Sequence, residues 1–441
     1  MRTIMACLAL CAGCAATPLQ YDPMLGELRR DERAQAGAGA RLAAVIGGKQ
    51  LDRATLVAAV VAANRDVEAM RQAWRAAAAE VGAATALDDP MASYALAPLG
   101  IGSSTASFGQ VIELRQKLPF PGKRRLAGEA ALDDAEVSRA DFQSAQLAVA
   151  ELASQLYDDA FVNARALEIN DRHRGLVEQM KKVAEARVAS SRGSTQDALQ
   201  AEVELGHLEH ERVMLDTERE TIVARINGLL HREPDAELPP PPSELPAPSA
   251  PPDVASLEQA AIAERPQEAA AAARVRANET RASLAERAYY PDFELTGSYN
   301  SMWDMPAHRW MLGVGLNLPI ERGKRAAEVA AAQARVAQAR AEAEDASDEI
   351  RVEVVRAQRE LVEAIHVLHL YDERLVPAAR AEVDAAEAGF TTGQNDFPAV
   401  INAERGLRDI ELGAFRARAD AWRRQAALDR AVGRSPQGGM P

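Results

Sequence analysis

The sequence predicts a mainly α-helical chain with a smaller β part, arranged as two tandem structural repeats. Three observations carry this prediction. A Leu-Pro junction rich in basic residues occurs twice, at 118–125 and 318–325. Each copy follows a segment in which apolar and polar residues alternate, as expected for strands with one apolar face. Each copy also precedes a helical segment of unusual length, so the junction and both its flanks recur together about 200 residues apart.

Proline and glycine are expected to end the strand at each junction and to turn the chain into a helix. Proline cannot donate a hydrogen bond to a neighbouring strand, and glycine tolerates most backbone conformations. An alternative is a pair of unrelated basic turns, but the matching flanks favour a repeat. The residues predicted to form the two strand-to-helix hinges are Pro119, Pro121, Gly122, Lys123, Pro319, Gly323 and Lys324.

The composition favours long packed helices and argues against nucleic acid as a partner. Alanine and charged residues are plentiful, aromatic residues make up only 4% of the 441 residues, and the net charge is −14. A surface of that charge repels phosphate.

The N-terminal residues indicate export. Residues 1–13 combine a basic start with a short apolar run, which is typical of a signal peptide. All three cysteines lie at positions 7, 11 and 14, so the mature chain cannot form an internal disulfide. The segment around Cys14 resembles a bacterial lipobox, which predicts lipidation of Cys14; ordinary signal cleavage nearby is the alternative. No later stretch reaches the roughly 20 apolar residues of a membrane helix, so any crossing must use strands.

The predicted elements follow in the same order twice. Residues 14–50 are expected to form a lipid anchor and an extended leader. Repeat 1 covers 51–233, with a helix from Leu51, a β-hairpin over 91–118 and long helices over 122–189 and 195–231. A stiff, Pro-rich linker over 234–252 leads into repeat 2, at 253–434. Repeat 2 has a helix, a β-hairpin over 291–320 and long helices over 323–390 and 396–433, before a tail at 435–441.

The two hairpins are expected to lie in a membrane. In the second one Phe293, Leu295 and Tyr299 alternate with polar residues, and many of the aromatic residues fall in or beside the hairpins. Four strands cannot close a barrel, and hydrocarbon does not tolerate an open edge, so several copies of the chain must pool their strands. The alternative is a soluble sheet packed on helices.

At this point the chain resembles a TolC-like outer-membrane efflux protein. The resemblance rests on the element order, and the hinge at 118–124 together with Asp89-Pro90-Met91 most resembles heavy-metal efflux members. It implies a homotrimer whose twelve-stranded outer-membrane β-barrel continues as a periplasmic α-helical barrel. Such proteins are passive exit ducts of Gram-negative cells for small molecules or heavy-metal ions; they are not enzymes and need no cofactor. The implied partners are outer-membrane lipid, a periplasmic adaptor (membrane fusion) protein and an inner-membrane pump of the resistance-nodulation-division type.

The resemblance also places a constriction and an adaptor contact at the two helical turns. Family members often carry an acidic pair at the second turn, but the matching positions here are Ala399 and Asn402. Asp396 either lines the pore or caps the returning helix. The implied aperture residues are Asn395, Asp396, Ala399, Asn402, Asp197 and Gln200. The implied adaptor-contact tips are Ser191, Gly193, Ser194, Thr392, Gly393 and Gln394.

Two pairs of histidines and one pair of methionines have the spacing of metal ligands, but nothing else in the sequence supports a metal site. His207 with His210 and His366 with His369 stand three apart on helices, and Met302 and Met305 flank a tryptophan. Solvated helix faces and loop packing are the simpler interpretations, so we predict no metal site and no enzymatic motif. Two other functions stay open: the exit duct of a type I-like protein secretion system, and a periplasmic coiled-coil scaffold without a pore.

Overall fold

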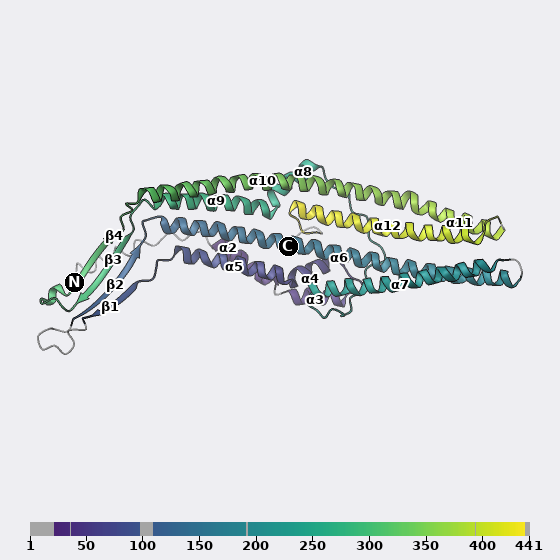
Figure 1. The fold of residues 1–441 in the computed structure, drawn as a ribbon, viewed down its shortest axis with the longest axis horizontal. Helices are drawn as coiled ribbons and strands as arrows, with labels where there is room; N and C mark the ends of the chain where they lie inside the picture. Colours follow the sequence, from purple (N-terminus) through teal and green to yellow (C-terminus); the bar gives the residue numbers. More distant parts are fainter. Residues whose placement is uncertain (1–21, 36, 98–108, 191–192, 393, 437–441) are drawn as a thin grey trace. The chain divides into compact units, whose positions relative to one another are not determined.

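The computed structural model describes residues 22–35, 37–97, 109–190, 193–392 and 394–436. The chain divides into two compact units (Figure 1). The sheet unit comprises Met1–Arg30, Arg71–Asp141 and Ala269–Ala346. The helical unit comprises Asp31–Met70, Phe142–Glu268 and Ser347–Pro441.

The sheet unit contains four antiparallel strands in the order β1-β2-β3-β4 (Figure 1). They are β1 (Met91–Leu96), β2 (Gln110–Leu118), β3 (Phe293–Asn300) and β4 (Trp310–Leu316). The strands that alternation predicted in each hairpin are therefore confirmed. The structure adds the pairing of β2 with β3, which joins the two hairpins into one sheet.

The register gives this sheet one apolar and one polar face. Ile112 lies opposite Tyr94 and Tyr299, and Leu295 lies opposite Val314. Side chains of directly paired residues share a face. The apolar sheet face includes Tyr94, Ile112, Leu114, Phe293, Leu295, Tyr299, Trp310, Leu312, Val314 and Leu316, and the register places Leu96, Leu118 and two glutamines, Gln110 and Gln116, on the same side. The other face carries an ion-pair ladder, in which Arg115 binds Glu113 and lies 3.5 Å from Glu294.

The apolar sheet face is open to its surroundings on β4. The exposed fraction is 91% for Leu312, 74% for Trp310 and 69% for Val314. An alternating pattern normally turns its apolar side toward a core. Here that side lacks a covering layer within the described part of this chain.

The remaining elements are helices. Helices that contribute to the sheet unit are α2 (Asp22–Gln35), α5 (Arg65–Thr85), α6 (Lys123–Ala189), α9 (Pro266–Arg287) and α10 (Arg322–Leu370). The others are α3 (Ala38–Gly47), α4 (Arg53–Ala63), α7 (Thr195–Leu229), α8 (Val254–Glu264), α11 (Val376–Thr392) and α12 (Phe397–Val432). In the described part of the chain, none of these helices is long and apolar enough to cross a membrane.

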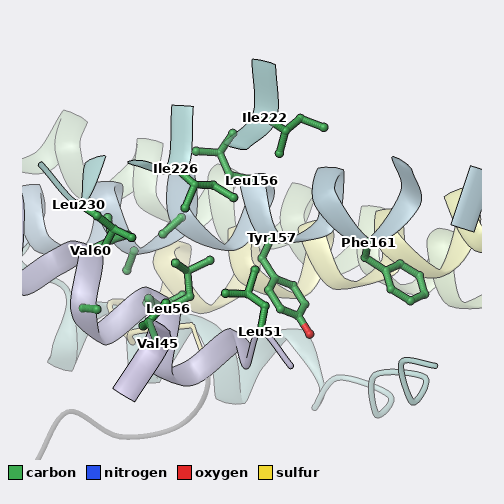
Figure 2. Close-up of a cluster of buried hydrophobic side chains, with 14 of the residues drawn as sticks. Val45, Leu51, Leu56, Val60, Leu156, Tyr157, Phe161, Ile222, Ile226 and Leu230 are labelled. Carbon is green, nitrogen blue, oxygen red and sulfur yellow. The ribbon is translucent and has the colours of Figure 1, made fainter. Parts of the chain in front are cut away.

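The core of the helical unit is built from helices far apart in the sequence (Figure 2). Val45, Leu56 and Val60 of α3 and α4 meet Leu156 of α6 and Ile226 of α7. Alanines such as Ala150 and Ala153 are also buried there, and their small size lets the helix backbones approach closely. One charged group joins this core: Arg53 of α4 donates to Asp158, at 3.0 Å for its Nη1, with the rings of Tyr157 and Trp422 beside its guanidinium.

Two sequence predictions about the N-terminal part are wrong. The expected extended leader over 14–50 contains helices α2 and α3 in its described part, because apolar residues such as Met24, Leu28 and Val45 are buried. The single helix expected from Leu51 breaks at Asn64, whose side chain accepts hydrogen bonds from the N–H groups of Asp66 and Val67. Asn64 thus caps the start of α5.

The helix predicted over 323–390 is also interrupted. A π-helical turn at Tyr371–Leu375 separates α10 from α11, and the N–H of Val376 donates to the carbonyl of Tyr371. Pro377 follows at once, and its ring nitrogen has no hydrogen to give to the preceding turn. The wider turn is a local way to accommodate this proline.

Candidate functional site

The first strand-to-helix junction is a braced turn. Lys123 Nζ lies 2.7 Å from Asp292 Oδ1, and the same oxygen accepts from the N–H of Phe120 at 2.8 Å. The rings of Phe120 and Tyr290 stack with centroids 4.7 Å apart. The chain before β3 therefore holds the turn after β2, and Asp292 is a junction residue that the sequence pattern did not reveal.

Gly122 has the conformation that a junction glycine was expected to supply. Its φ is +92°, which L side chains rarely adopt. A Cβ at this position would also collide with the guanidinium of Arg287, which donates to the carbonyl of Pro121 at 2.8 Å.

The second junction is built differently, which corrects the prediction that both glycines turn the chain. Helix α10 already begins at Arg322, so Gly323 lies inside its first turn, and a Cβ added there would meet nothing within 4 Å. The change of direction falls on residues 317–321, where the N–H of Ile320 donates to the carbonyl of Leu318 at 2.9 Å. Pro319 lies within this turn and Lys324 is exposed beside Glu328.

The two helical turns of the helical unit hold the predicted tip residues. Ser194 caps α7 by accepting from the N–H of Gln196 at 3.1 Å. Asp396 caps α12 by accepting from the N–H of Ala399 at 3.1 Å. This contact shows that Asp396 is a helix cap. The N–H of Gln394 donates to the carbonyl of Gly389 at 2.8 Å, which closes the α11–α12 turn.

The end of the α6–α7 helix pair packs against the end of the α11–α12 helix pair. Phe397 and Ile401 of α12 are buried with Val177 of α6 and Leu208 of α7. The Arg187 guanidinium lies 3.9 Å from the centroid of the Phe390 ring. The α6–α7 pair and the α11–α12 pair are therefore in direct contact at this end.

The predicted aperture residues lie near the starts of α7 and α12 and differ in burial. Asn402 and Gln200 are exposed, Ala399 and Asp197 are half-buried, and Asn395 Nδ2 lies 3.4 Å from the carbonyl of Ala386. Thr392 donates to the carbonyl of Ala388 at 3.0 Å, and Gly193 is exposed. Cys14, Ser191 and Gly393, to which the sequence assigned roles, lie outside the described residues.

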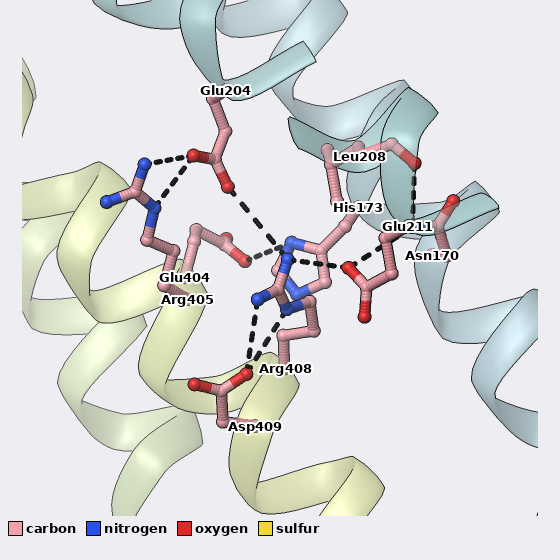
Figure 3. Close-up of polar contacts among 9 residues, drawn as sticks. All are labelled: Asn170, His173, Glu204, Leu208, Glu211, Glu404, Arg405, Arg408 and Asp409. Atoms are coloured by element: carbon pink, nitrogen blue, oxygen red, sulfur yellow. Dashed lines mark hydrogen bonds and ion pairs between the residues drawn. The ribbon is translucent and has the colours of Figure 1, made fainter. Parts of the chain in front are cut away.

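A polar cluster lies deeper between the two helix pairs, and three of its members, His173, Glu204 and Glu404, are buried (Figure 3). This hairpin-crossing cluster consists of His173 of α6, Glu204 and Glu211 of α7, and Glu404, Arg405 and Arg408 of α12. Arg405 donates to Glu204, at 2.8 Å for its Nε, and Arg408 Nη1 lies 3.2 Å from Glu211. His173 Nδ1 lies 3.6 Å from Glu404 Oε2.

Burial shifts the proton affinities of this cluster. His173 and Glu404 are each 5% exposed. Burial, together with Arg408 and Arg172, lowers the pKa of His173 to about 4. Burial and the carboxylates of Glu387 and Glu411 raise the pKa of Glu404, whose Oε2 has no hydrogen-bond partner among the described residues.

A second set of ion pairs borders a cavity of about 320 Å³. Arg172 of α6 and Arg380 of α11 both bind Glu411 of α12, and Arg418 Nη2 lies 2.6 Å from Asp372 in the π-helical turn. Each of these arginines thus has an acidic partner, so the cavity wall is close to charge balance.

Sequence reasoning missed the hairpin-crossing cluster. The match of 201–205 with 403–407 placed these helices in equivalent positions, but it carried no signal that they touch. His207, His210, His366 and His369 are all exposed. Within the described residues, no three His, Cys, Asp or Glu side chains are grouped as a metal site requires.

Comparison with known proteins agrees with this architecture. The family model for outer membrane efflux proteins matches residues 257–434. Among curated protein sequences, none matches this chain.

Three solved structures illustrate the similarity of fold. The outer-membrane channel OprN is 21% identical, with 86% of this chain aligned to 89% of that one and a TM-score of 0.73. For CusC the identity is 17%, the coverage 87% and 92%, and the TM-score 0.74. For the MtrE outer membrane channel of Neisseria gonorrhoeae the values are 18%, 86% and 88%, and 0.71. The TolC-like resemblance is thereby confirmed: this chain has the fold of outer-membrane channels, and its residues 257–434 match the family model for outer membrane efflux proteins.

Proposed function

We propose that this protein is the outer-membrane channel subunit of a tripartite efflux pump. It acts as a passive exit duct for small molecules or heavy-metal ions, and energy enters at the pump. It is a duct rather than an enzyme, because its family domain is that of an efflux channel.

The apolar sheet face carries this proposal. Apolar and aromatic side chains from all four strands make up most of one side of the sheet, and Leu312 is 91% exposed. Exposing such a face to water is costly, at about 25 cal/mol per Å² of apolar surface. The polar face, with Glu113, Arg115 and Glu294, suits a water-filled lumen.

The strand count supports a trimer. A membrane-embedded sheet of four strands has two open edges, which hydrocarbon does not tolerate. Three copies supply twelve strands, and the resulting barrel continues as a periplasmic α-helical barrel. We infer that each chain contributes two tandem repeats to this assembly, since a helix, a hairpin and long helices occur twice in the same order.

The remaining roles follow from this arrangement. The tips at Gly193, Ser194, Thr392 and Gln394, with Ser191 and Gly393, contact a periplasmic adaptor that links the duct to an inner-membrane pump of the resistance-nodulation-division type. The aperture lies at the same turns. Ala399 and Asn402 stand there in place of the acidic pair. Cys14 carries the lipid anchor.

The decisive experiment uses the full-length protein in lipid. We expect a trimer that is stable in detergent and resistant to SDS, with a low conductance in planar bilayers. Proteoliposomes without the protein and a heat-denatured sample are the controls. A monomer that is released without detergent would contradict the proposal and would favour a periplasmic scaffold instead.

A further inference from the structure

We propose that Arg322 of one copy binds Asp89 of the next copy and thereby fixes how β4 pairs with β1 between copies. This subunit seam, the contact of β4 with β1 of the next copy, rests on the trimer of the proposed function. The sheet order β1-β2-β3-β4 leaves the outer edges of β1 and β4 without a neighbouring strand in the described part of this chain. Such edges carry unpaired backbone groups, which a second copy can satisfy.

The pairing of β2 with β3 provides a template for the subunit seam, because it joins repeat 1 to repeat 2. At that junction Lys123, the first residue of α6, lies 2.7 Å from Asp292, the residue before β3. If three copies close a ring, β4 of one copy meets β1 of the next as β2 meets β3. The ion pair inside the chain therefore implies a second one between copies.

The strand register identifies Asp89 as the counterpart of Asp292. The N–H of Asn317 donates to the carbonyl of Asp292 at 3.0 Å, so Asp292 lies opposite the residue that precedes the second Leu-Pro. Continuing the register of β1 with β2 to two residues before β1 places Asp89 opposite Lys117. Lys117 precedes the first Leu-Pro, so the two aspartates hold the same place in their hairpins.

Arg322 is the cation that faces the open edge. A match by sequence alone would equate Lys123 with Lys324, but α10 already begins at Arg322, as α6 begins at Lys123. Lys324 lies 3.9 Å from Glu328 of its own helix. Arg322 and Asp89 are both exposed, and neither side chain has a hydrogen-bond or ion-pair partner among the described residues. Arginine can bind a carboxylate through two parallel hydrogen bonds, so the two groups are complementary.

Only the ion pair carries over from the first junction to the subunit seam. Asp292 also accepts the N–H of Phe120 at 2.8 Å. The corresponding N–H of Ile320 donates to the carbonyl of Leu318, inside its own turn. The contact at the subunit seam is therefore made by side chains, and substitutions can test it.

The same correspondence gives the register of the two edge strands. Transferring the β2–β3 register onto β4 and β1 places Val314 of one copy opposite Tyr94 of the next, and Gly315 opposite Ser93. Val314 and Tyr94 both belong to the apolar sheet face, so this face continues from one copy to the next. A slip of one residue would instead bring Tyr94 to the polar side of its neighbour.

Charge reversal in the full-length protein in lipid tests the ion pair. Arg322→Glu and Asp89→Arg should each weaken trimer association by about tenfold, because an exposed ion pair contributes roughly a factor of two and a trimer holds three of them. The double variant should regain most of the wild-type stability, since it restores the pair with its charges exchanged. The ratio of SDS-resistant trimer to monomer over a range of SDS concentrations measures this.

Matched controls change the same charges at neighbouring positions. Lys324→Glu and Asp88→Arg should each leave trimer association within about a factor of two of the wild type, because an exposed charge without a partner across the seam contributes little. The Arg322–Asp89 pair is refuted if Lys324→Glu weakens the trimer as much as Arg322→Glu does. It is also refuted if the double variant is no more stable than the single ones.

Cross-linking covers the case in which the charge variants do not fold. The native cysteines all lie within the first 14 residues. Ser93→Cys combined with Gly315→Cys should form a disulfide between copies on oxidation, since directly paired positions bring their Cβ atoms to about 4.5–5.5 Å. Gly313→Cys with Ser93→Cys is the control and should cross-link far less, because diagonal neighbours are about 7–8 Å apart. A Cβ at either glycine meets no atom closer than 3.5 Å. Preferred cross-linking of the Gly313 variant would overturn the register.

Conductance of the same samples in planar bilayers separates this proposal from the duct. A wild type that forms no trimer refutes both. Conducting trimers that show neither rescue by the double variant nor the cross-link between positions 93 and 315 refute only the subunit seam. Cross-linked trimers that do not conduct refute only the duct.

Discussion

At the scale of single residues, Gly122 and Gly323 occupy matching places in the sequence but have different structural roles. Gly122 has a φ of +92° and borders Arg287, whereas Gly323 lies in the first turn of α10 with open space around it. Gly122→Ala should lower the free energy of unfolding by about 1–3 kcal/mol, because a non-glycine residue is strained there. Gly323→Ala should raise it by up to about 1 kcal/mol. Guanidinium chloride unfolding in detergent compares the two variants, and equal effects would contradict this account.

His173 should make stability depend on pH. Its pKa is about 4 in the folded protein against 6.5 in the unfolded chain. As the pH falls through 6.5 the unfolded state therefore binds the proton first, and stability is lost until about pH 4. Between pH 7 and pH 4 the wild type should lose about 3 kcal/mol of stability through His173. His173→Gln has no imidazole and should not show this loss.

Unfolding curves at several pH values measure this difference between variant and wild type. His210→Gln is the control, because His210 is exposed on α7. A difference between His173→Gln and wild type that stays constant from pH 7 to pH 4 would show that folding does not lower the pKa of His173.

At the scale of helices, two substitutions of Asp396 can separate the effect of its charge from its role as the N-cap of α12. Its carboxylate accepts the N–H of Ala399 at 3.1 Å. Asp396→Ala should cost about 1 kcal/mol of stability, whereas Asp396→Asn should cost little because asparagine is also a good N-cap. Thermal unfolding measures both. If Asp396→Asn leaves stability intact but changes cation selectivity, Asp396 also lines the pore.

The contact between α12 and the π-helical turn predicts that two glycines of α12 differ in how well they tolerate alanine. A Cβ on Gly413 of α12 would lie 2.7 Å from Cε1 of Tyr371, whereas a Cβ on Gly406 meets nothing within 4 Å. Gly413→Ala should therefore destabilise the protein by about 1–3 kcal/mol through overpacking. Gly406→Ala, on the same helix, should be neutral or stabilising by up to about 1 kcal/mol. Urea unfolding of both variants provides the comparison, and a harmless Gly413→Ala would mean that Tyr371 moves freely.

The elements that could be predicted from the sequence are those with a clear pattern among neighbouring residues. Strict alternation located β3 and β4, and alanine-rich segments located the long helices, because both signals come from neighbours along the chain. The helices within the leader were missed because their few apolar residues become buried only through distant partners. The hairpin-crossing cluster could not be predicted for the same reason: Glu204 and Arg405 meet only after two helix pairs have packed.

At the scale of the whole molecule, the apolar sheet face should determine whether the protein enters a membrane. Leu312 lies near the middle of β4 on that face, and Ser93 lies on the polar face opposite Glu113. Leu312→Arg should destabilise the lipid-inserted protein by about 2–4 kcal/mol, which is the usual cost of a cation on the lipid side of a barrel. Ser93→Arg places the same charge beside a carboxylate, so insertion should persist. Flotation with liposomes and the yield of SDS-resistant trimer measure both variants. Equal insertion of the two would mean that the apolar sheet face meets water and not lipid, since hydrocarbon penalises a charge and water does not.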